Sequence, residues 1–243
     1  MKQHYYNYWS KIFDLELNTL LDANPMLNKS GRYITKHGDK YIYFYQDLTN
    51  SKKILTASLK NQIMYNLNVN DLSYLNSANI NNFKNLHLAF HDIDYGFSRP
   101  TDFIKHQTIS TNLLIKKINA EDTSTLDDFL KLCSEDDIDT LDLDLTNDYA
   151  LGAYINNQLI GVSRYVKIRE TQVADITVLI APMFRNQKSS IPLVSEIVEN
   201  ILSNDLCPKY RVKEDNLASM KIAEKLGFQQ LFHISALDTE QSN

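Results

Sequence analysis

The chain has 243 residues and a formal net charge of −5, which is long enough to bury the core of one large domain or two small ones. The acidic balance excludes a broad basic surface for nucleic acid, but it leaves room for a local basic site that binds the phosphates of a small ligand. Two cysteines are too few for a disulfide framework, and the scattered histidines indicate no zinc site.

The sequence predicts neither a signal peptide nor a membrane-spanning segment. Residues 1–9 are amphipathic and lack the apolar run of a signal peptide. No stretch of about 18 apolar residues occurs further along, so we expect no membrane-spanning helix. We therefore expect a cytoplasmic protein.

The N-terminal part predicts a mixture of helix and strand. Apolar residues recur at helical spacing over residues 5–23, and Asn24-Pro25 ends that run. Aromatic and β-branched residues predict a strand over 41–45, and 53–57 is a weaker strand candidate. A helical pattern follows over 59–78.

A polar stretch comes after the next predicted strand, which covers residues 86–90. His91, Asp92 and Asp94 suggest a metal or acid–base site, but no third ligand is evident. We interpret them as part of a turn-rich polar loop. We place a domain boundary near residue 108, which gives an N-terminal α/β domain (1–108) and a C-terminal domain (109–243).

The C-terminal domain begins with a strand predicted over 113–118 and a helix whose apolar face includes Phe129 and Cys133. Residues 135–148 are strongly acidic. They lack the Gly and the closing Glu of an EF-hand loop, so we predict no calcium site. We interpret this run as a solvated loop, with a wall that attracts a cationic amine as the functional alternative.

Two hairpins follow. The strands predicted over 149–155 and 158–168 flank Asn156-Asn157, and Asn tolerates the positive φ that a tight turn needs. A second turn near 169–171 leads into a strand over 173–181. The apolar character of this last strand is typical of the centre of a sheet.

A polar turn then opens a helix. Pro192 suits only the first turn of a helix, which predicts a start at Ser189 or Ser190. Free backbone N–H groups and the positive end of the helix dipole favour an anion at such a start. Because the turn also carries Arg185 and Lys188, we predict that it holds a phosphate.

The remaining chain predicts a strand over 210–212, a helix and a final strand over 229–237. Asp215 or Asn216 is the expected N-cap of the helix. Gly227 is expected to end it in the left-handed conformation.

These motifs resemble the GNAT superfamily of acyl-CoA N-acyltransferases over roughly the second half of the chain. The positions that match the central motif of the family are Ile180, Pro182, Arg185, Leu193 and Val194. Those that match its later signature are Asn216, Ala218, Ser219 and Glu224 to Phe228. The sequence departs from the family at the turn, where Lys188 and Ser190 replace glycines, and at Ala223, where many members have Tyr.

The expected fold class is therefore α+β (mixed α/β), with a GNAT-like mixed, mostly antiparallel sheet flanked by helices. The smaller α/β domain before it has an order of helix and strand pieces that suits a degenerate second copy of this fold.

The resemblance implies a site for acetyl-CoA as co-substrate. Val178 and Ile180 would offer backbone groups to the pantetheine arm. The residues implied to hold the pyrophosphate are Arg185, Asn186, Gln187, Lys188, Ser189 and Ser190. Asn216 and Ser219 would face the cofactor from the second helix. The chemistry implied is direct attack of a neutral amine on the thioester, without an acyl-enzyme.

Two residues are candidates for the proton transfers that this attack needs. Asp175 lies on the central strand and is our candidate base, directly or through water; the alternative is an exposed carboxylate on a sheet face. Tyr210 is our candidate acid in place of the Tyr missing at Ala223; the alternative is a strand tyrosine that packs by its ring. Cys207 has no positioned His and is not expected to be a nucleophile.

The predicted activity is acetyl-CoA-dependent N-acetyl transfer to a primary amine of a small molecule or peptide. The alternative is an inactive CoA-binding or regulatory member of the same fold. A tandem-GNAT aminoacyl transferase that uses charged tRNA is disfavoured by the acidic balance. We expect no nucleic-acid, membrane or metal partner, and a homodimer is compatible with the sequence.

Overall fold

The computed structural model describes residues 1–12, 31–34, 41–49, 53–57, 87–107, 112–185, 187 and 189–238. The chain divides into two compact units. Unit I comprises Met1, Gly96–Tyr210 and Ala218–Gln229, and unit II comprises Lys2–Tyr95, Arg211–Leu217 and Gln230–Asn243. The boundary expected near residue 108 and the helix expected over 59–78 lie outside the described residues.

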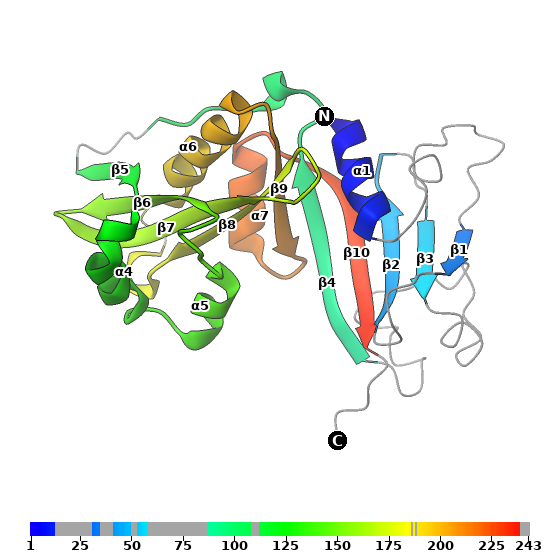
Figure 1. The fold of residues 1–243 in the computed structure, drawn as a ribbon, viewed down its shortest axis with the longest axis horizontal. Coiled ribbons are helices and arrows are strands. Elements are labelled where there is room, and N and C mark those ends of the chain that lie inside the picture. Colours follow the sequence, from blue (N-terminus) through cyan, green and yellow to red (C-terminus); the bar gives the residue numbers. More distant parts are fainter. Residues whose placement is uncertain are drawn as a thin grey trace. The chain divides into compact units, whose positions relative to one another are not determined.

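Unit I is built on a mostly antiparallel sheet (Figure 1). Its strands, in order across the sheet, are β5 (Leu113–Lys117), β6 (Tyr149–Ile155), β7 (Gln158–Lys167), β8 (Val173–Ile180) and the first part of β9 (Cys207–Lys213). The pairs from β5 to β8 are antiparallel, whereas β8 and β9 are parallel. The β6–β7 turn has positive φ at Asn156 (50°) and Asn157 (63°), which confirms the predicted hairpin.

Helices cover both faces of this sheet. They are α4 (Thr123–Leu130), α5 (Glu135–Leu141), α6 (Ser190–Ser203) and α7 (Leu217–Lys225). Adjacent side chains of β7 identify the faces, because neighbours along a strand point to opposite sides. Arg164 donates to the carbonyl of Leu141 at the end of α5, and Tyr165 donates to Asn200 on α6. The sheet therefore lies between α5 and α6, as Figure 1 shows.

The start of α6 agrees with the prediction from Pro192. The helix begins at Ser190, with Ser189 as its N-cap, so that the proline falls in the first turn, where its missing N–H costs no hydrogen bond. The apolar face of α6 is fully buried against the sheet and consists of Leu193, Val194, Ile197, Val198 and Ile201.

Unit II combines N-terminal elements with the last strand of the chain. Its elements are α1 (Lys2–Ile12), β1 (Gly31–Ile34), β2 (Tyr41–Asp47), β3 (Lys53–Ala57), β4 (His87–Gly96) and β10 (Gln229–Asp238). β2 pairs antiparallel with both β3 and β10. Trp9 of α1 packs its ring against Tyr45 and Phe232, with centroids 5.7 Å and 6.4 Å away. The C-terminal strand thus shares a core with the N-terminal helix.

The prediction of a polar loop after residue 90 is wrong. His91, Asp92 and Asp94 lie within β4, which continues to Gly96. Asp94 is buried, and Arg211 donates to it at 3.0 Å. Pairing with a guanidinium is what lets a carboxylate stay buried, so these acids hold a strand rather than line a loop.

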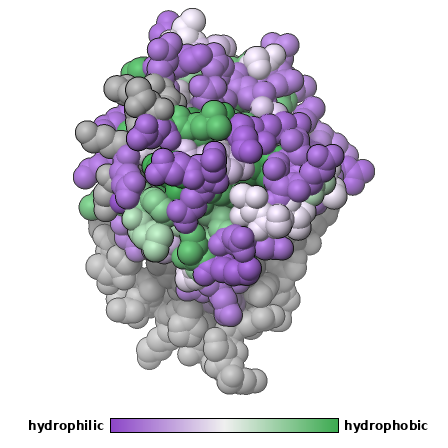
Figure 2. Space-filling model, turned by 90° about the vertical axis from the view of Figure 1, so that its left-hand side faces the viewer, coloured by the Kyte–Doolittle hydropathy of each residue, from purple (hydrophilic) through white to green (hydrophobic). Residues whose placement is uncertain are grey.

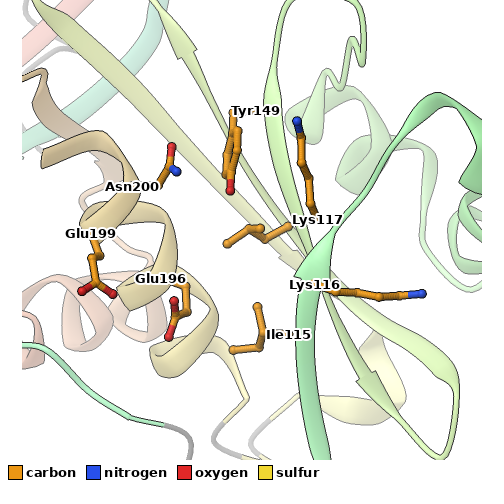
Figure 3. A pocket seen from close by; sticks show the side chains of 8 residues that line it. Ile115, Lys116, Lys117, Tyr149, Glu196, Glu199 and Asn200 are labelled. Atoms are coloured by element: carbon orange, nitrogen blue, oxygen red, sulfur yellow. The ribbon is translucent and has the colours of Figure 1, made fainter. Parts of the chain in front are cut away.

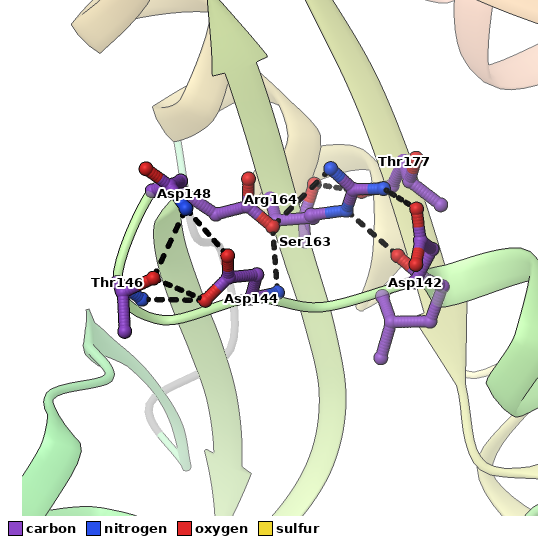
Figure 4. Close-up of polar contacts among 9 residues, drawn as sticks. Asp142, Asp144, Thr146, Asp148, Ser163, Arg164 and Thr177 are labelled. Atoms are coloured by element: carbon purple, nitrogen blue, oxygen red, sulfur yellow. Dashed lines mark hydrogen bonds and ion pairs between the residues drawn. The ribbon is translucent and has the colours of Figure 1, made fainter.

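The interpretation of residues 135–148 as a solvated loop is also wrong in part. The first half forms α5, where the Ser134 side chain caps the helix by accepting from the N–H of Asp137. The second half is anchored by Arg164, which donates to the Leu141 carbonyl at 2.7 Å and pairs with Asp148 at 3.2 Å (Figure 4). Asp142 lies 3.6 Å from the same guanidinium.

Replacing Arg164 should destabilise the protein in a pH-dependent way. Arg164→Gln would leave the Asp148 carboxylate buried without its cation, which costs about 3–5 kcal/mol. Burial already raises the pKa of Asp148, and Arg164 opposes that rise. We therefore expect the loss of unfolding free energy to be largest near neutral pH and to shrink as the pH falls, because a protonated carboxyl needs no cation. Urea unfolding across pH measures this, and a pH-independent loss would contradict it.

Gly227 should be intolerant of a side chain. Its φ is +82°, and a Cβ would lie 2.2 Å from the carbonyl oxygen of Asp102, which is backbone and cannot rotate away. We expect Gly227→Ala to cost at least about 1–2 kcal/mol from the left-handed conformation alone. The exposed Lys221→Ala change on α7 should stay within about 0.5 kcal/mol of the parent in the same urea titration. Equal stability of the two variants would refute this account of the helix end.

Candidate functional site

The central feature of unit I is a parallel ladder that stops early. β8 and β9 pair only from Val173 with Cys207 to Ile176 with Tyr210. β8 nevertheless continues to Ile180, and β9 continues to Lys213. Residues 177–180 of β8 therefore lie beyond the last pair with β9.

The backbone groups of Val178 and Ile180 point away from β7. The Val173 carbonyl accepts from the N–H of Ile168, directly after β7, and the Ala181 N–H donates to Ile160 of β7; bonded pairs alternate with non-bonded pairs in an antiparallel ladder. Even-numbered residues of β8 consequently direct their N–H and C=O groups to the side where β9 pairs. For Val178 and Ile180 that side lies beyond the ladder with β9, and there the Ile180 carbonyl accepts from Nε of Arg185 at 3.1 Å.

Asp175 lies one residue before the end of this ladder and is ion-paired. Its Oδ1 accepts from Nζ of Lys209, its register partner on β9, at 2.9 Å. The Lys209 side chain is 1% exposed, whereas that of Asp175 is 35% exposed. The carboxylate can therefore meet solvent on one side while the ammonium holds it on the other.

Tyr210 is the last β9 residue of the ladder and is buried. Burial raises its pKa to about 12, and a hydrogen bond with Ser219 of α7 acts in the opposite direction. Its ring also packs against Phe228, with centroids 6.1 Å apart. At neutral pH this hydroxyl stays protonated, so it can donate a hydrogen bond.

The two candidate catalytic residues lie close along the ladder but face opposite ways. Paired residues of a parallel ladder share a face, so Asp175 shares one with Lys209 and Tyr210 shares the other with Ile176. The structure therefore brings both to the end of the ladder without bringing their side chains together. A ligand group would have to meet them from different sides of the sheet.

Arg185 follows the short 3-10 helix Pro182–Phe184, and two groups of unit I hold its side chain. Nε donates to the carbonyl of Ile180 at 3.1 Å, and Nη2 donates to Asp137 of α5 at 2.7 Å. The residue expected to bind phosphate is thus engaged by a backbone acceptor and a carboxylate. Both contacts are at the surface, so an anion can reach the guanidinium.

The rest of the turn is described in part. Ser189 is buried at the N-cap of α6, and Ser190 is the first helical residue. The Gln187 amide donates weakly to the Met183 carbonyl at 3.4 Å. Asn186 and Lys188 lie outside the described residues. The helix start offers backbone N–H groups as expected.

The two polar residues of the later motif take different positions. Ser219 is in the first turn of α7 and bonds Tyr210. Asn216 is exposed, directly precedes α7 and belongs to unit II. Their predicted contacts with a cofactor stay predictions.

Sequence reasoning missed Lys209 and Asp137. Lys209 lies between Pro208 and Tyr210 in a strand that also carries Arg211 and Lys213, so its sequence context does not distinguish it as a buried lysine. Its partner depends on the register of two parallel strands, which the sequence does not reveal. Asp137 was not singled out because it lies in the acidic run of residues 135–148, where nothing in the sequence distinguishes one carboxylate from the next.

A separate cavity of about 270 Å³ lies between α6 and the edge strand β5 (Figure 3). Its lining includes Tyr149, Glu196, Glu199 and Asn200, and no predicted site residue. Glu199 forms an ion pair with Lys105, whose Nζ lies 2.6 Å from the Glu199 Oε1. The coloured part of the face shown in Figure 2 is mostly hydrophilic, with separate hydrophobic areas.

The described residues contain neither a candidate metal site nor a candidate membrane span. Within them, no group of three or more His, Cys, Asp or Glu side chains is arranged to hold a metal ion. No helix among these residues is long and apolar enough to cross a membrane.

Comparison with known proteins identifies the fold through structure alone. No protein-family model and no curated protein sequence matches the chain. The solved structures that resemble it include a GCN5-related N-acetyltransferase from Kribbella flavida, with a TM-score of 0.51 and 10% identity over 68% of this chain and 64% of that one.

Two further structures align with a TM-score of 0.49. One is described as a GNAT-family acetyltransferase from Novosphingobium aromaticivorans, at 10% identity over 65% of this chain and 69% of that chain. The other is a functionally unknown conserved protein from Staphylococcus epidermidis, at 12% identity over 75% and 80%. This chain spans less than two thirds of the Kribbella protein it matches. Its fold is GNAT-like, as the motifs predicted.

Proposed function

We propose that the protein is an acyltransferase that moves the acetyl group of acetyl-CoA to a primary amine of a small molecule or peptide. The observation that carries this proposal is the early end of the β8–β9 ladder. It leaves the backbone groups of Val178 and Ile180 directed to where a pantetheine amide could pair with them. The turn at Arg185 and the start of α6 lie directly after them in the chain, as a pyrophosphate site requires.

The reaction would proceed by direct attack. The nitrogen of a neutral amine forms a bond to the thioester carbonyl carbon, the C–S bond breaks, and CoA leaves as a thiolate. The amine proton passes to Asp175, directly or through water, because this carboxylate is partly exposed at the end of the ladder. The Lys209 ammonium keeps one carboxylate oxygen occupied and so orients the other.

Tyr210 would act as a hydrogen-bond donor rather than as a full acid. With a pKa of about 12, its hydroxyl is a weaker acid than a thiol near 8.5 by roughly three pKa units. Complete transfer of its proton to the thiolate is therefore uphill. A hydrogen bond that stabilises the developing charge is favourable, and water supplies the proton.

A second candidate is a CoA-binding protein without turnover. Ala223, buried on α7, offers no hydroxyl where many members of the resembled family have a tyrosine. This candidate shares the cofactor site and differs only in chemistry. Turnover measurements separate the two.

The cofactor site can be tested by calorimetric titration of acetyl-CoA. Loss of a charge-assisted hydrogen bond to phosphate should make Arg185→Ala bind about tenfold more weakly than the parent. Arg169→Ala is the matched control, since this arginine is exposed at the turn between β7 and β8. If both variants bind acetyl-CoA equally weakly, Arg185 contributes only through the net charge of the protein and not through a direct contact. No binding by the parent at millimolar ligand would refute the proposal.

The catalytic roles can be tested by thiol release with a panel of primary amines. Asp175→Asn should lower kcat by about 10²-fold or more with acetyl-CoA affinity unchanged, because it removes the proton acceptor. Tyr210→Phe should lower kcat by about tenfold, the value of one hydrogen bond to a charged group. Thermal melting checks that each variant is folded. Unchanged turnover in Asp175→Asn would exclude this base, and absence of turnover in the parent with any amine would favour the non-catalytic candidate.

A further inference from the structure

Arg185 donates to the Ile180 carbonyl, which the proposed cofactor would need, and to the Asp137 carboxylate. We propose that Asp137 and the Ile180 carbonyl hold Arg185 in a closed arrangement that acyl-CoA must open, so that Asp137 is a positioning residue that couples helix α5 to cofactor binding. This inference rests on the proposed function and adds a competitor within the protein to it.

The Ile180 carbonyl is the backbone group for which Arg185 and the cofactor would compete. Ile180 is one of the two β8 residues whose backbone groups point beyond the ladder. Its carbonyl already accepts from Nε of Arg185 at 3.1 Å. A pantetheine N–H that pairs with this carbonyl has to share or displace the guanidinium.

The Asp137 carboxylate competes with the cofactor for the Arg185 guanidinium. A guanidinium binds carboxylate and phosphate through the same N–H groups, so Asp137 and a pyrophosphate are competing partners of Arg185. The two side chains are 47% and 29% exposed, and a pair so accessible to water is weak. A multiply charged anion can therefore replace Asp137 as the partner of Arg185 at little cost.

The release of Arg185 from Asp137 would affect helix α5. Asp137 lies in the first turn of α5, which is capped by Ser134 and packs against β8. The Arg185–Asp137 pair thus ties this helix to the residues that follow β8. When the cofactor takes Arg185, that tie is lost and a carboxylate of α5 is left without its cation.

Cys133 reports on this arrangement without any cofactor. The thiol lies just before α5 and is partly buried. Burial raises its pKa, the Asp137 carboxylate raises it further, and the Arg185 guanidinium lowers it. The rate of alkylation follows the thiolate fraction, so both charges can be sensed at one atom.

The closed arrangement can be tested by alkylating Cys133 in the cofactor-free protein, followed by peptide mass spectrometry that resolves it from the buried Cys207. Asp137→Asn should speed the reaction and Arg185→Ala should slow it. Asp139→Asn is the matched control, since it removes the same charge from an exposed position of α5. If Asp137→Asn behaves like Asp139→Asn, Asp137 does not adjoin the thiol and the arrangement is refuted, whatever the protein binds.

The coupling to cofactor can be tested by titrating acetyl-CoA into the same variants. Removing the competitor should make Asp137→Asn bind about two- to fivefold more tightly than the parent, beyond any change in Asp139→Asn. In the Arg185→Ala background, Asp137→Asn and Asp139→Asn should have equal effects. Weaker binding by Asp137→Asn, or an advantage that persists without Arg185, would overturn the proposal. No binding by the parent or by Asp137→Asn would instead refute the proposed function, and this coupling with it.

Discussion

The parallel pairing of β8 with β9 is the constraint on which the site depends. It lasts for four residue pairs and ends at Ile176 and Tyr210. Because hydrogen bonding alternates along β8, the end of this ladder determines which backbone groups of β8 point to the side of β9 without pairing with it. It also places Asp175, Lys209 and Tyr210 on its last two pairs. A shift of β9 by one residue would turn Lys209 and Tyr210 to the opposite faces of the sheet, while Asp175 would keep its face because β7 also pairs with β8.

The site that results is held by partners rather than left open. Lys209 holds Asp175, Ser219 bonds Tyr210, and Asp137 holds Arg185. A ligand binds to such a site by exchanging partners, so its affinity reflects the difference between two sets of contacts. Under the proposed function, the Asp137 carboxylate therefore affects cofactor affinity alongside the groups that would touch the cofactor.

Local patterns in the sequence predicted much of unit I, including both hairpins, the start of α6 and the left-handed Gly227. Each of these depends on the backbone preferences of a few neighbouring residues such as Asn156-Asn157 and Pro192. The errors have another origin. The acidic run was interpreted as solvated loop because the sequence does not show that Arg164 enters the sheet beneath it and pairs with Asp148. Likewise, nothing near β10 in the sequence indicates that it pairs with β2.

In the candidate site, too, local features could be predicted from the sequence, whereas features that depend on tertiary packing could not. The motif at Arg185 was recognisable from residue types and spacing, whereas its partner Asp137 depends on how α5 packs against β8. The opposite orientations of Asp175 and Tyr210 required the register of β8 with β9, which is a tertiary property. Residue identity therefore indicated the chemistry, and only the fold supplied the directions in which the groups point.

The most direct test of the account is backbone amide hydrogen exchange along β8, measured at residue resolution with and without acetyl-CoA. The amides of Ala174 and Ile176 lie within the ladder and should exchange slowly in both states. Those of Val178 and Ile180 should exchange faster in the free protein and become protected when the cofactor pairs with them. Unchanged exchange at Val178 and Ile180, in a protein saturated with acetyl-CoA, would contradict the claim that the end of the ladder is the cofactor site.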